Sequence, residues 1–243
     1  MNGFPFGGVE KESNGKPTSK SYEGDFDEIE VSESINATLI KSDLEKVVIH
    51  APSDVIDYIV VENKGGKLSI YVESNIRLSM KNIRADIYAK DFTSLEANSS
   101  ATINLKDKFV QEKVEISASS SGSVFGSLEA NDLKIESNSS GEFSGKIWAI
   151  NLDMEASSSG SISVSGNSKN GKLEANSSGS ISAQNLEIQN LEAESSSSGS
   201  ITANVTQTLN AEANSSGSIT ISTKGNLAHQ IINKSTGGSV TIN

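Results

Sequence analysis

An eleven-residue phrase that returns throughout the second half of the chain constrains its fold more than any other feature. LEANSSGSISA occupies Leu173–Ala183, and close relatives of it occupy 154–164 and 211–221. The glycine of the phrase serves as a mark, and successive marks lie 18 to 21 positions apart. These marks are Gly122, Gly141, Gly160, Gly179, Gly199 and Gly217, with Ala101 and Gly237 or Gly238 in equivalent places.

Apolar and polar residues alternate on both sides of each mark. Around Gly160, for example, Leu152, Met154 and Ala156 stand eight, six and four positions before it, and Ile162 stands two positions after it. Alternation with a period of two indicates a β-strand, and the Ser, Asn and Gly between the two alternating stretches are typical turn residues. Each repeat is therefore expected to contain a strand, a tight corner and another strand.

The length of the repeat predicts a β-helix. A unit of about 19 residues cannot bury its own apolar face, so units must stack on one another. We therefore predict an all-β fold, a single-stranded right-handed parallel β-helix with about 19–20 residues per coil, the hand following that of parallel crossovers. Residues 94–243 should form about seven coils, with Ile162, Ile181, Ile201 and Ile219 in one internal column. Serine is expected to recur because stacked hydroxyls can hydrogen-bond from corner to corner.

The composition of the chain changes along its length. Residues 1–23 are rich in Gly, Asn and polar residues, and we interpret them as a flexible leader. Residues 24–243 are expected to form one β-helix domain, with less regular N-terminal coils over 24–93 and regular Ser/Gly-cornered repeats over 94–243. The N-terminal part has short β-rich stretches such as KVVIHA and DYIVVE, separated by turn signals.

Charge and residue content exclude several functions. The formal net charge of −11 makes nucleic acid an unsuitable partner. The chain has no cysteine, which excludes disulfides and thiolate metal sites. No apolar run reaches the roughly 20 residues that a spanning helix needs, so no integral membrane segment is expected. No cofactor and no metal ligand are assigned.

Catalytic residues are not expected either. His50 and His229 are the two histidines, and the first alternates with Val48 within a predicted strand while the second falls in an irregular final repeat. Glycosidases need a pair of carboxylates with divergent pKa values in a cleft. Carboxylates are so common in this chain that no single pair stands out, and we predict that the protein is not an enzyme.

The candidate site is a column of glutamates five positions before the marks, at Glu96, Glu136, Glu155, Glu174, Glu194 and Glu212, with Ser117 in the equivalent place. That position alternates with the inward ones, so these side chains should project from one outer face. Coils stack about 4.8 Å apart, and each adjacent pair should repel by roughly 0.9 kcal/mol in water before salt screening. Two positions earlier, Lys134 and Lys172 should partly offset this charge. The column is either a solvated face that opposes aggregation or a surface for a cation or a basic partner, where calcium would bind weakly.

A longer segment resembles a known family. FDEIEVSESINATLIKSDLEKVVIHAPSDVIDYIVVENKGGKLSIYVE (Phe26–Glu73), followed by the LEANSSATI and ASSSGSV repeats, is similar to the head GIN domain of putative auto-transporter adhesins. The resemblance implies a right-handed β-helix that is exported to the periplasm, outer membrane or cell surface of a Gram-negative bacterium, in many members on a lipid anchor. It implies no catalytic motif.

These observations lead to one leading hypothesis and two alternatives. The leading hypothesis is a non-catalytic cell-envelope binding or adhesion module, with a glycan or an envelope or surface protein as its partner; homo-oligomer formation stays open. The alternatives are a polysaccharide-active enzyme on the same scaffold and a purely structural surface spacer. Exposed aromatics in a groove would favour carbohydrate binding, and a cleft with a perturbed acid pair would favour the enzyme.

Overall fold

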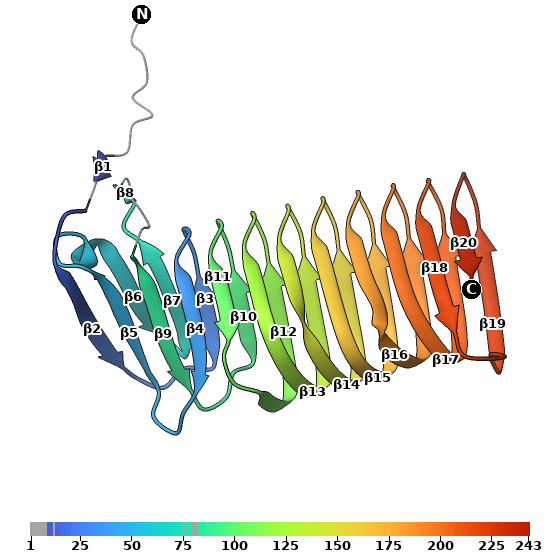
Figure 1. Ribbon diagram of the computed structural model, residues 1–243, viewed down its shortest axis with the longest axis horizontal. Helices are drawn as coiled ribbons and strands as arrows, with labels where there is room; N and C mark the ends of the chain where they lie inside the picture. Colours follow the sequence, from blue (N-terminus) through green and yellow to red (C-terminus); the bar gives the residue numbers. More distant parts are fainter. Residues whose placement is uncertain (1–8, 12, 75, 79–81) are drawn as a thin grey trace, which may run out of the picture.

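The protein is an elongated stack of β-coils. The structure is a computed structural model, and it describes residues 9–11, 13–74, 76–78 and 82–243. Its regular part runs from β10 to β20 and forms a β-solenoid (Figure 1). The strands of this part are β10 (Ser94–Ala97), β11 (Thr102–Leu105), β12 (Phe109–Ala118), β13 (Ser123–Ser137), β14 (Glu142–Ala156), β15 (Ser161–Ala175), β16 (Ser180–Ser195), β17 (Ser200–Ala213), β18 (Ser218–Thr223), β19 (His229–Lys234) and β20 (Ser239–Ile242). No α-helix occurs among the described residues, so the all-β prediction is confirmed.

Neighbouring coils pair in parallel, and the repeat sets their register. Ile162 pairs with Ile181, Ile181 with Ile201, and Ile201 with Ile219. All four side chains are buried, which confirms the predicted internal column. The small residues before the corners, Ala156, Ala175 and Ala213, are buried as well. Each coil thus buries its apolar residues against identical positions of the next coil, as stacked repeats must.

The sharp corners lie along one edge of the stack, and their serines adopt the left-handed conformation. In the corner before β15, the φ angles of Ser158 and Ser159 are 49° and 65°. The backbone N–H of Gly160 closes this turn by donating a hydrogen bond of 2.7 Å to the Ser157 carbonyl. A Cβ on Gly160 would lie 2.1 Å from the carbonyl oxygen of Ser137 in the preceding coil. Glycine is therefore required here by the close approach of two coils, while serine provides the left-handed turn.

The expectation that stacked, equivalent serine hydroxyls bond to one another from coil to coil is wrong for the described corners, although single hydroxyls do link coils. In the described corners most links between coils are backbone hydrogen bonds, for example from the Ser159 amide to the Ser177 carbonyl at 3.3 Å. Among these corners, a corner hydroxyl adds to the backbone links in one place, where Ser119 donates to the side-chain oxygen of Asn98 in the neighbouring coil.

Just before the corner in two coils, a buried serine hydroxyl bonds within its own coil and also accepts a backbone amide of the next coil, from Ser161 to Ser137 at 3.1 Å and from Ser218 to Ser195 at 3.2 Å. The buried Ser137 hydroxyl donates to the Gly141 carbonyl at 2.6 Å, and the buried Ser195 hydroxyl donates to the Gly199 carbonyl at 2.7 Å. Other coils place alanine at this position.

In the N-terminal region, the strands do not stack in the order in which they occur in the sequence. Its elements are β1 (Val9–Lys11), β2 (Pro17–Glu23), β3 (Glu28–Val31), β4 (Asn36–Lys41), β5 (Lys46–Pro52), the 3-10 helix η1 (Ile56–Tyr58), β6 (Ile59–Lys64), β7 (Lys67–Val72), β8 (Ile76–Leu78) and β9 (Arg84–Ala89). β3 pairs in parallel with both β7 and β10, and β4 with both β9 and β11. The coil made of β3 and β4 therefore lies between β10–β11 and the later strands β7 and β9.

Antiparallel strands complete this end of the stack. β5 pairs antiparallel with β9 and with β2, and β6 pairs antiparallel with β7. Residues 24–93 are thus a mixed sheet around parallel coils, not only a series of less regular coils. β1 and β2 lie inside the range 1–23 that we expected to be a flexible leader, and both are strands. β1 pairs with β8, and β2 pairs with β5 from Pro17↔Pro52 to Glu23↔Lys46. Such pairing covers a sheet edge that would otherwise be open to aggregation.

Candidate functional site

The predicted glutamate column is present in the structure, because its residues are pairing partners in neighbouring strands. Glu136, Glu155 and Glu174 are consecutive pairing partners in β13, β14 and β15. Glu194 and Glu212 continue the series after Glu174. At the other end of the column, Glu96 pairs with Ser117, and Ser117 pairs with Glu136. Glu30, which sequence reasoning left out, pairs with Glu96 and extends the column by one coil. Its role as a cation or partner surface stays a prediction.

Lysines neutralise part of the glutamate column. The Lys134 ammonium binds the Glu136 carboxylate, and the Lys172 ammonium binds the Glu174 carboxylate. Hydrogen bonding to these two glutamates raises the pKa of Lys134 and of Lys172 above the ordinary lysine value. The predicted offset by lysines is therefore confirmed, at alternate coils.

The two lysines belong to a second column, in which opposite charges alternate. This alternating column consists of Glu115, Lys134, Asp153, Lys172 and Glu192, which pair in register from coil to coil. Neighbouring carboxylates add to the rise in the lysine pKa values, with Asp153 acting on both lysines. Because charges of opposite sign are adjacent, this column stabilises the stack where a column of one sign would oppose it.

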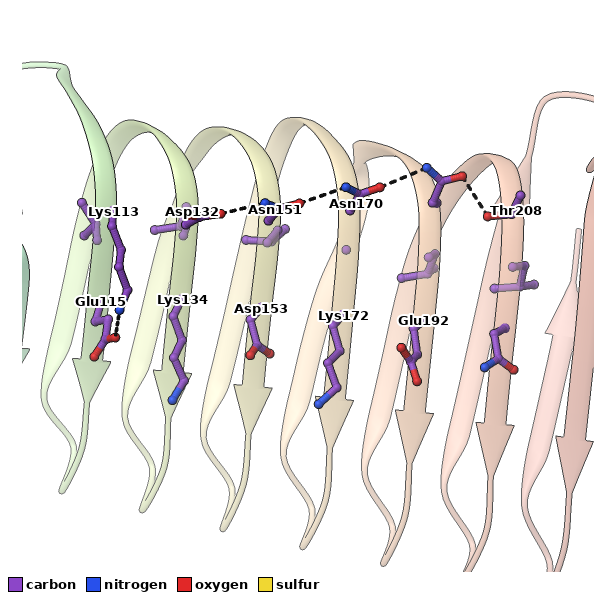
Figure 2. A pocket seen from close by; sticks show the side chains of 18 of the residues that line it. Lys113, Glu115, Asp132, Lys134, Asn151, Asp153, Asn170, Lys172, Glu192 and Thr208 are labelled. Atoms are coloured by element: carbon purple, nitrogen blue, oxygen red, sulfur yellow. Dashed lines mark hydrogen bonds and ion pairs between the residues drawn. The ribbon is translucent and has the colours of Figure 1, made fainter.

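A third column is a hydrogen-bonded ladder, which sequence reasoning missed. The Asn151 side-chain amide donates to the Asp132 carboxylate at 2.7 Å, and the Asn170 amide donates to Asn151 at 2.9 Å. The Asn190 amide donates to Asn170 at 3.0 Å, and the Thr208 hydroxyl donates to Asn190 at 2.9 Å. We call these five residues the asparagine ladder (Figure 2). All of its donors point toward Asp132, so the amide dipoles align and end on a charged acceptor.

A groove lies between the asparagine ladder and the alternating column. It has a volume of about 650 Å³ and runs across the coils from Lys113 to His229. In Figure 2 the labelled residues of the ladder form one line and those of the alternating column form a second, parallel line. Leu133, Leu152 and Leu191, which pack into the core, contribute to the strip between the two lines. The same pattern of donors and acceptors therefore recurs along the groove at the spacing of the coils.

The groove chemistry suits binding better than proton transfer. Its hydroxyl, that of Thr208, donates to Asn190, and the Asp132 carboxylate accepts from Asn151. The carboxylates of the alternating column lie next to lysines. The described residues contain no group of three or more His, Cys, Asp or Glu side chains placed to hold a metal ion. His229 lies at the end of the groove, whereas His50 lies elsewhere, half-buried, with its Nε2 2.9 Å from an Asp86 carboxylate oxygen. In the described part of the chain, no helix has the length and apolar character needed to cross a membrane.

Comparison with known proteins gives one family and several similar folds. The family model described as "Putative auto-transporter adhesin, head GIN domain" matches residues 25–225. A putative adhesin from Parabacteroides distasonis ATCC 8503 is 21% identical, with a TM-score of 0.85 over 97% of this chain and 100% of that one. A putative lipid binding protein from the same organism is 25% identical, with a TM-score of 0.81 and the same coverage.

A third structure, a putative adhesin from Parabacteroides merdae ATCC 43184, is 17% identical, with a TM-score of 0.83 over 96% of this chain and 99% of that one. At this level of identity the likeness shows the fold alone. Curated proteins give no significant match.

Proposed function

Because the chain belongs to the family described as putative auto-transporter adhesin, head GIN domain, we propose that it is a non-catalytic binding or adhesion module of the cell envelope. The family and the similar structures are described as adhesins, with one lipid binding protein among them, and none is described as an enzyme. The proposal extends to an exported location at the periplasm, outer membrane or cell surface of a Gram-negative bacterium, with a lipid anchor.

The observation that carries the proposal is the groove between the asparagine ladder and the alternating column. A pocket for a small substrate would be closed and local, whereas this groove extends along the stack and repeats its polar groups from coil to coil. Such a surface fits an extended ligand that itself has repeating polar groups. The hydrogen bonds of the ladder and the parallel pairing hold both walls in place before the ligand arrives, which lowers the cost of binding. We assign the groove to an extended glycan.

Binding of the purified protein to a glycan array, followed by titration of the best ligand, tests this proposal. The groove variant combines Asp153→Asn and Lys172→Gln, which remove two adjacent charges from one wall while keeping similar side-chain sizes. The matched control is Lys224→Gln, because Lys224 is exposed and lies outside the groove. We expect the groove variant to bind the glycan at least tenfold more weakly, equivalent to about 1.4 kcal/mol, and the control to bind normally.

The other outcomes separate the alternatives. Glycan binding that both variants retain would move the binding surface away from the groove. Shortening of the glycan during incubation would show a polysaccharide-active enzyme, and the absence of binding to glycans and to isolated envelopes would leave a structural spacer.

A further inference from the structure

The most unusual apolar residue of the surface is Trp148. It is the one tryptophan of the chain, and 44% of it is exposed. It projects from the middle of β14, where its pairing partners are Glu129 in β13 and Asn167 in β15. The coils offer many inward positions for a large apolar side chain, and leaving an indole in water forgoes the free energy of burying it. Its outward position therefore calls for an explanation other than the stability of the fold.

Trp148 lines a hollow that is separate from the groove. The hollow has a volume of about 520 Å³, within the range of roughly 300–1,000 Å³ typical of small-molecule sites. It shares no residue with the groove between the asparagine ladder and the alternating column. We call it the tryptophan hollow.

Two glycines, Gly126 and Gly166, line the tryptophan hollow. Gly126 and Gly166 have φ angles of 144° and 120°, which side-chain-bearing residues rarely adopt. A Cβ on Gly166 would also lie 2.0 Å from the Ile147 carbonyl oxygen, and a Cβ on Gly126 would lie 2.5 Å from the Leu105 Cβ. These glycines are required where the coil bends, because the backbone is in a conformation that favours glycine and a Cβ would clash with the neighbouring coil.

The hollow carries an excess of positive charge in an acidic protein. Lys106, Lys108 and Lys146 line it together with Asp107 and Glu129. Glu129 binds the Lys108 ammonium at 2.6 Å, and Asp107 accepts a bond from the backbone amide of Lys41 at 3.0 Å. Within the described residues no carboxylate pairs with Lys106 or Lys146. Two ammonium groups are therefore available to an anion, although the chain as a whole carries a net charge of −11.

We propose that the tryptophan hollow binds an acidic saccharide. The apolar C–H face of a sugar ring would stack on the indole of Trp148, and its carboxylate would bind Lys146 and Lys106. Ser127 and Asn167, both exposed at the hollow, supply donors and acceptors for the ring hydroxyls. An aromatic surface with a few convergent polar groups is the usual composition of a site that recognises a small ligand. This site does not depend on the groove or on the extended glycan assigned to it.

Trp148 itself provides the measurement, because it is the one source of indole fluorescence in the chain. The intact protein is titrated with hexuronate oligosaccharides and, in parallel, with neutral hexose oligosaccharides of the same length. We expect the hexuronates to change the emission and to bind at least tenfold more tightly than the neutral sugars, a difference that shrinks as salt is added. Isothermal titration calorimetry then follows Trp148→Ala, which should weaken binding about tenfold.

Two variants and one further titration make the test specific. Lys146→Gln should weaken hexuronate binding without weakening binding of the neutral sugar, whereas Lys169→Gln, an exposed lysine outside the hollow, should change neither. Unchanged emission with every hexuronate, or equal binding by Trp148→Ala, would overturn the proposal. A response to vesicles of anionic phospholipid, with none to hexuronates, would also overturn it and indicate a membrane contact. The groove variant with Asp153→Asn and Lys172→Gln should bind hexuronates normally, so failure at one site is distinguishable from failure at the other.

Discussion

The side-chain amide of Asn151 donates a hydrogen bond of 2.7 Å to the carboxylate of Asp132, one coil away. This bond ends a ladder in which every donor points the same way, and the ladder forms one wall of the groove. The two residues pair in register as neighbours in β13 and β14. Because the backbone pairing already fixes their separation, the side-chain bond forms with little additional loss of freedom.

The ladder should contribute measurably to stability. Asn170→Ala removes a donor to Asn151 and an acceptor for Asn190, so two polar groups lose their partners. Because the ladder is partly exposed and water can replace some bonds, we expect a loss of about 1 kcal/mol in the free energy of unfolding. Asn185→Ala is the matched control, since Asn185 is exposed and outside the ladder. Urea unfolding of both variants measures the difference, and equal midpoints would show that the ladder adds nothing to the backbone pairing.

The two kinds of corner residue should respond in opposite ways to substitution. Gly160→Ala places a Cβ 2.1 Å from the Ser137 carbonyl oxygen, and we expect destabilisation of about 1–3 kcal/mol or more, since the backbone on both sides is held by pairing. Ser159→Gly removes a left-handed serine with φ of 65° and should be neutral or stabilising by up to about 1 kcal/mol. Thermal unfolding distinguishes the two variants. Similar losses of stability in the two variants would contradict the interpretation that only the glycine position is too close to the neighbouring coil for a side chain.

The glutamate column should contain two kinds of glutamate. Glu174 binds Lys172, whereas Glu155 has no lysine partner in the described part of the chain and lies between Glu136 and Glu174. At pH 7 we expect Glu174→Gln to cost less than about 1 kcal/mol. Glu155→Gln should be neutral or slightly stabilising, because it removes repulsion of roughly 0.9 kcal/mol per unscreened neighbour. Chemical unfolding of both variants checks the contrast, and a larger loss for Glu155→Gln would show that the column is not repulsive.

The pH dependence of the Glu174 effect follows from the pKa of Lys172. Hydrogen bonding to Glu174 raises that pKa above the ordinary value of 10.5. A raised folded-state pKa means that the ion pair stabilises the protein fully below the unfolded value and that this contribution is lost as pH rises through the folded value. The difference between the intact protein and Glu174→Gln should therefore disappear at strongly alkaline pH.

Salt should act on the glutamate column by screening. We expect sodium chloride and calcium chloride at matched ionic strength to raise the melting temperature equally, since repulsion between exposed carboxylates weakens with ionic strength. Calorimetric scans in the two salts measure this. A larger rise in melting temperature with calcium chloride, abolished by Glu155→Gln, would instead show that the glutamate column binds cations, which is one of the two interpretations given from the sequence.

The parallel stack could be predicted because each repeat has the same local pattern of apolar and polar residues, at a nearly constant spacing. Alternation around Gly160 identifies which side chains face inward, and equal spacing then places Ile162 over Ile181 and Glu155 over Glu174. Once units of equal length stack, these columns follow from geometry alone. The glutamate column and its alternating neighbour therefore came from counting residues. The family resemblance was confirmed as well, since the family model matches residues 25–225, most of the chain.

The tertiary structure decided what depends on contacts between segments without a shared period. The pairing of β3 with both β7 and β10, and the use of β2 as an edge strand, depend on how apolar surfaces of unequal segments fit together. The tryptophan hollow arises at a bend, where the alternation breaks and a sequence pattern no longer indicates which way a side chain points. The residues of the asparagine ladder do share the period, since each stands nine positions before a mark, but only the structure shows that their side chains bond to one another. A repeat determines which residues share a column; the path of the backbone between the corners determines whether that column closes into a ladder or opens beside Trp148.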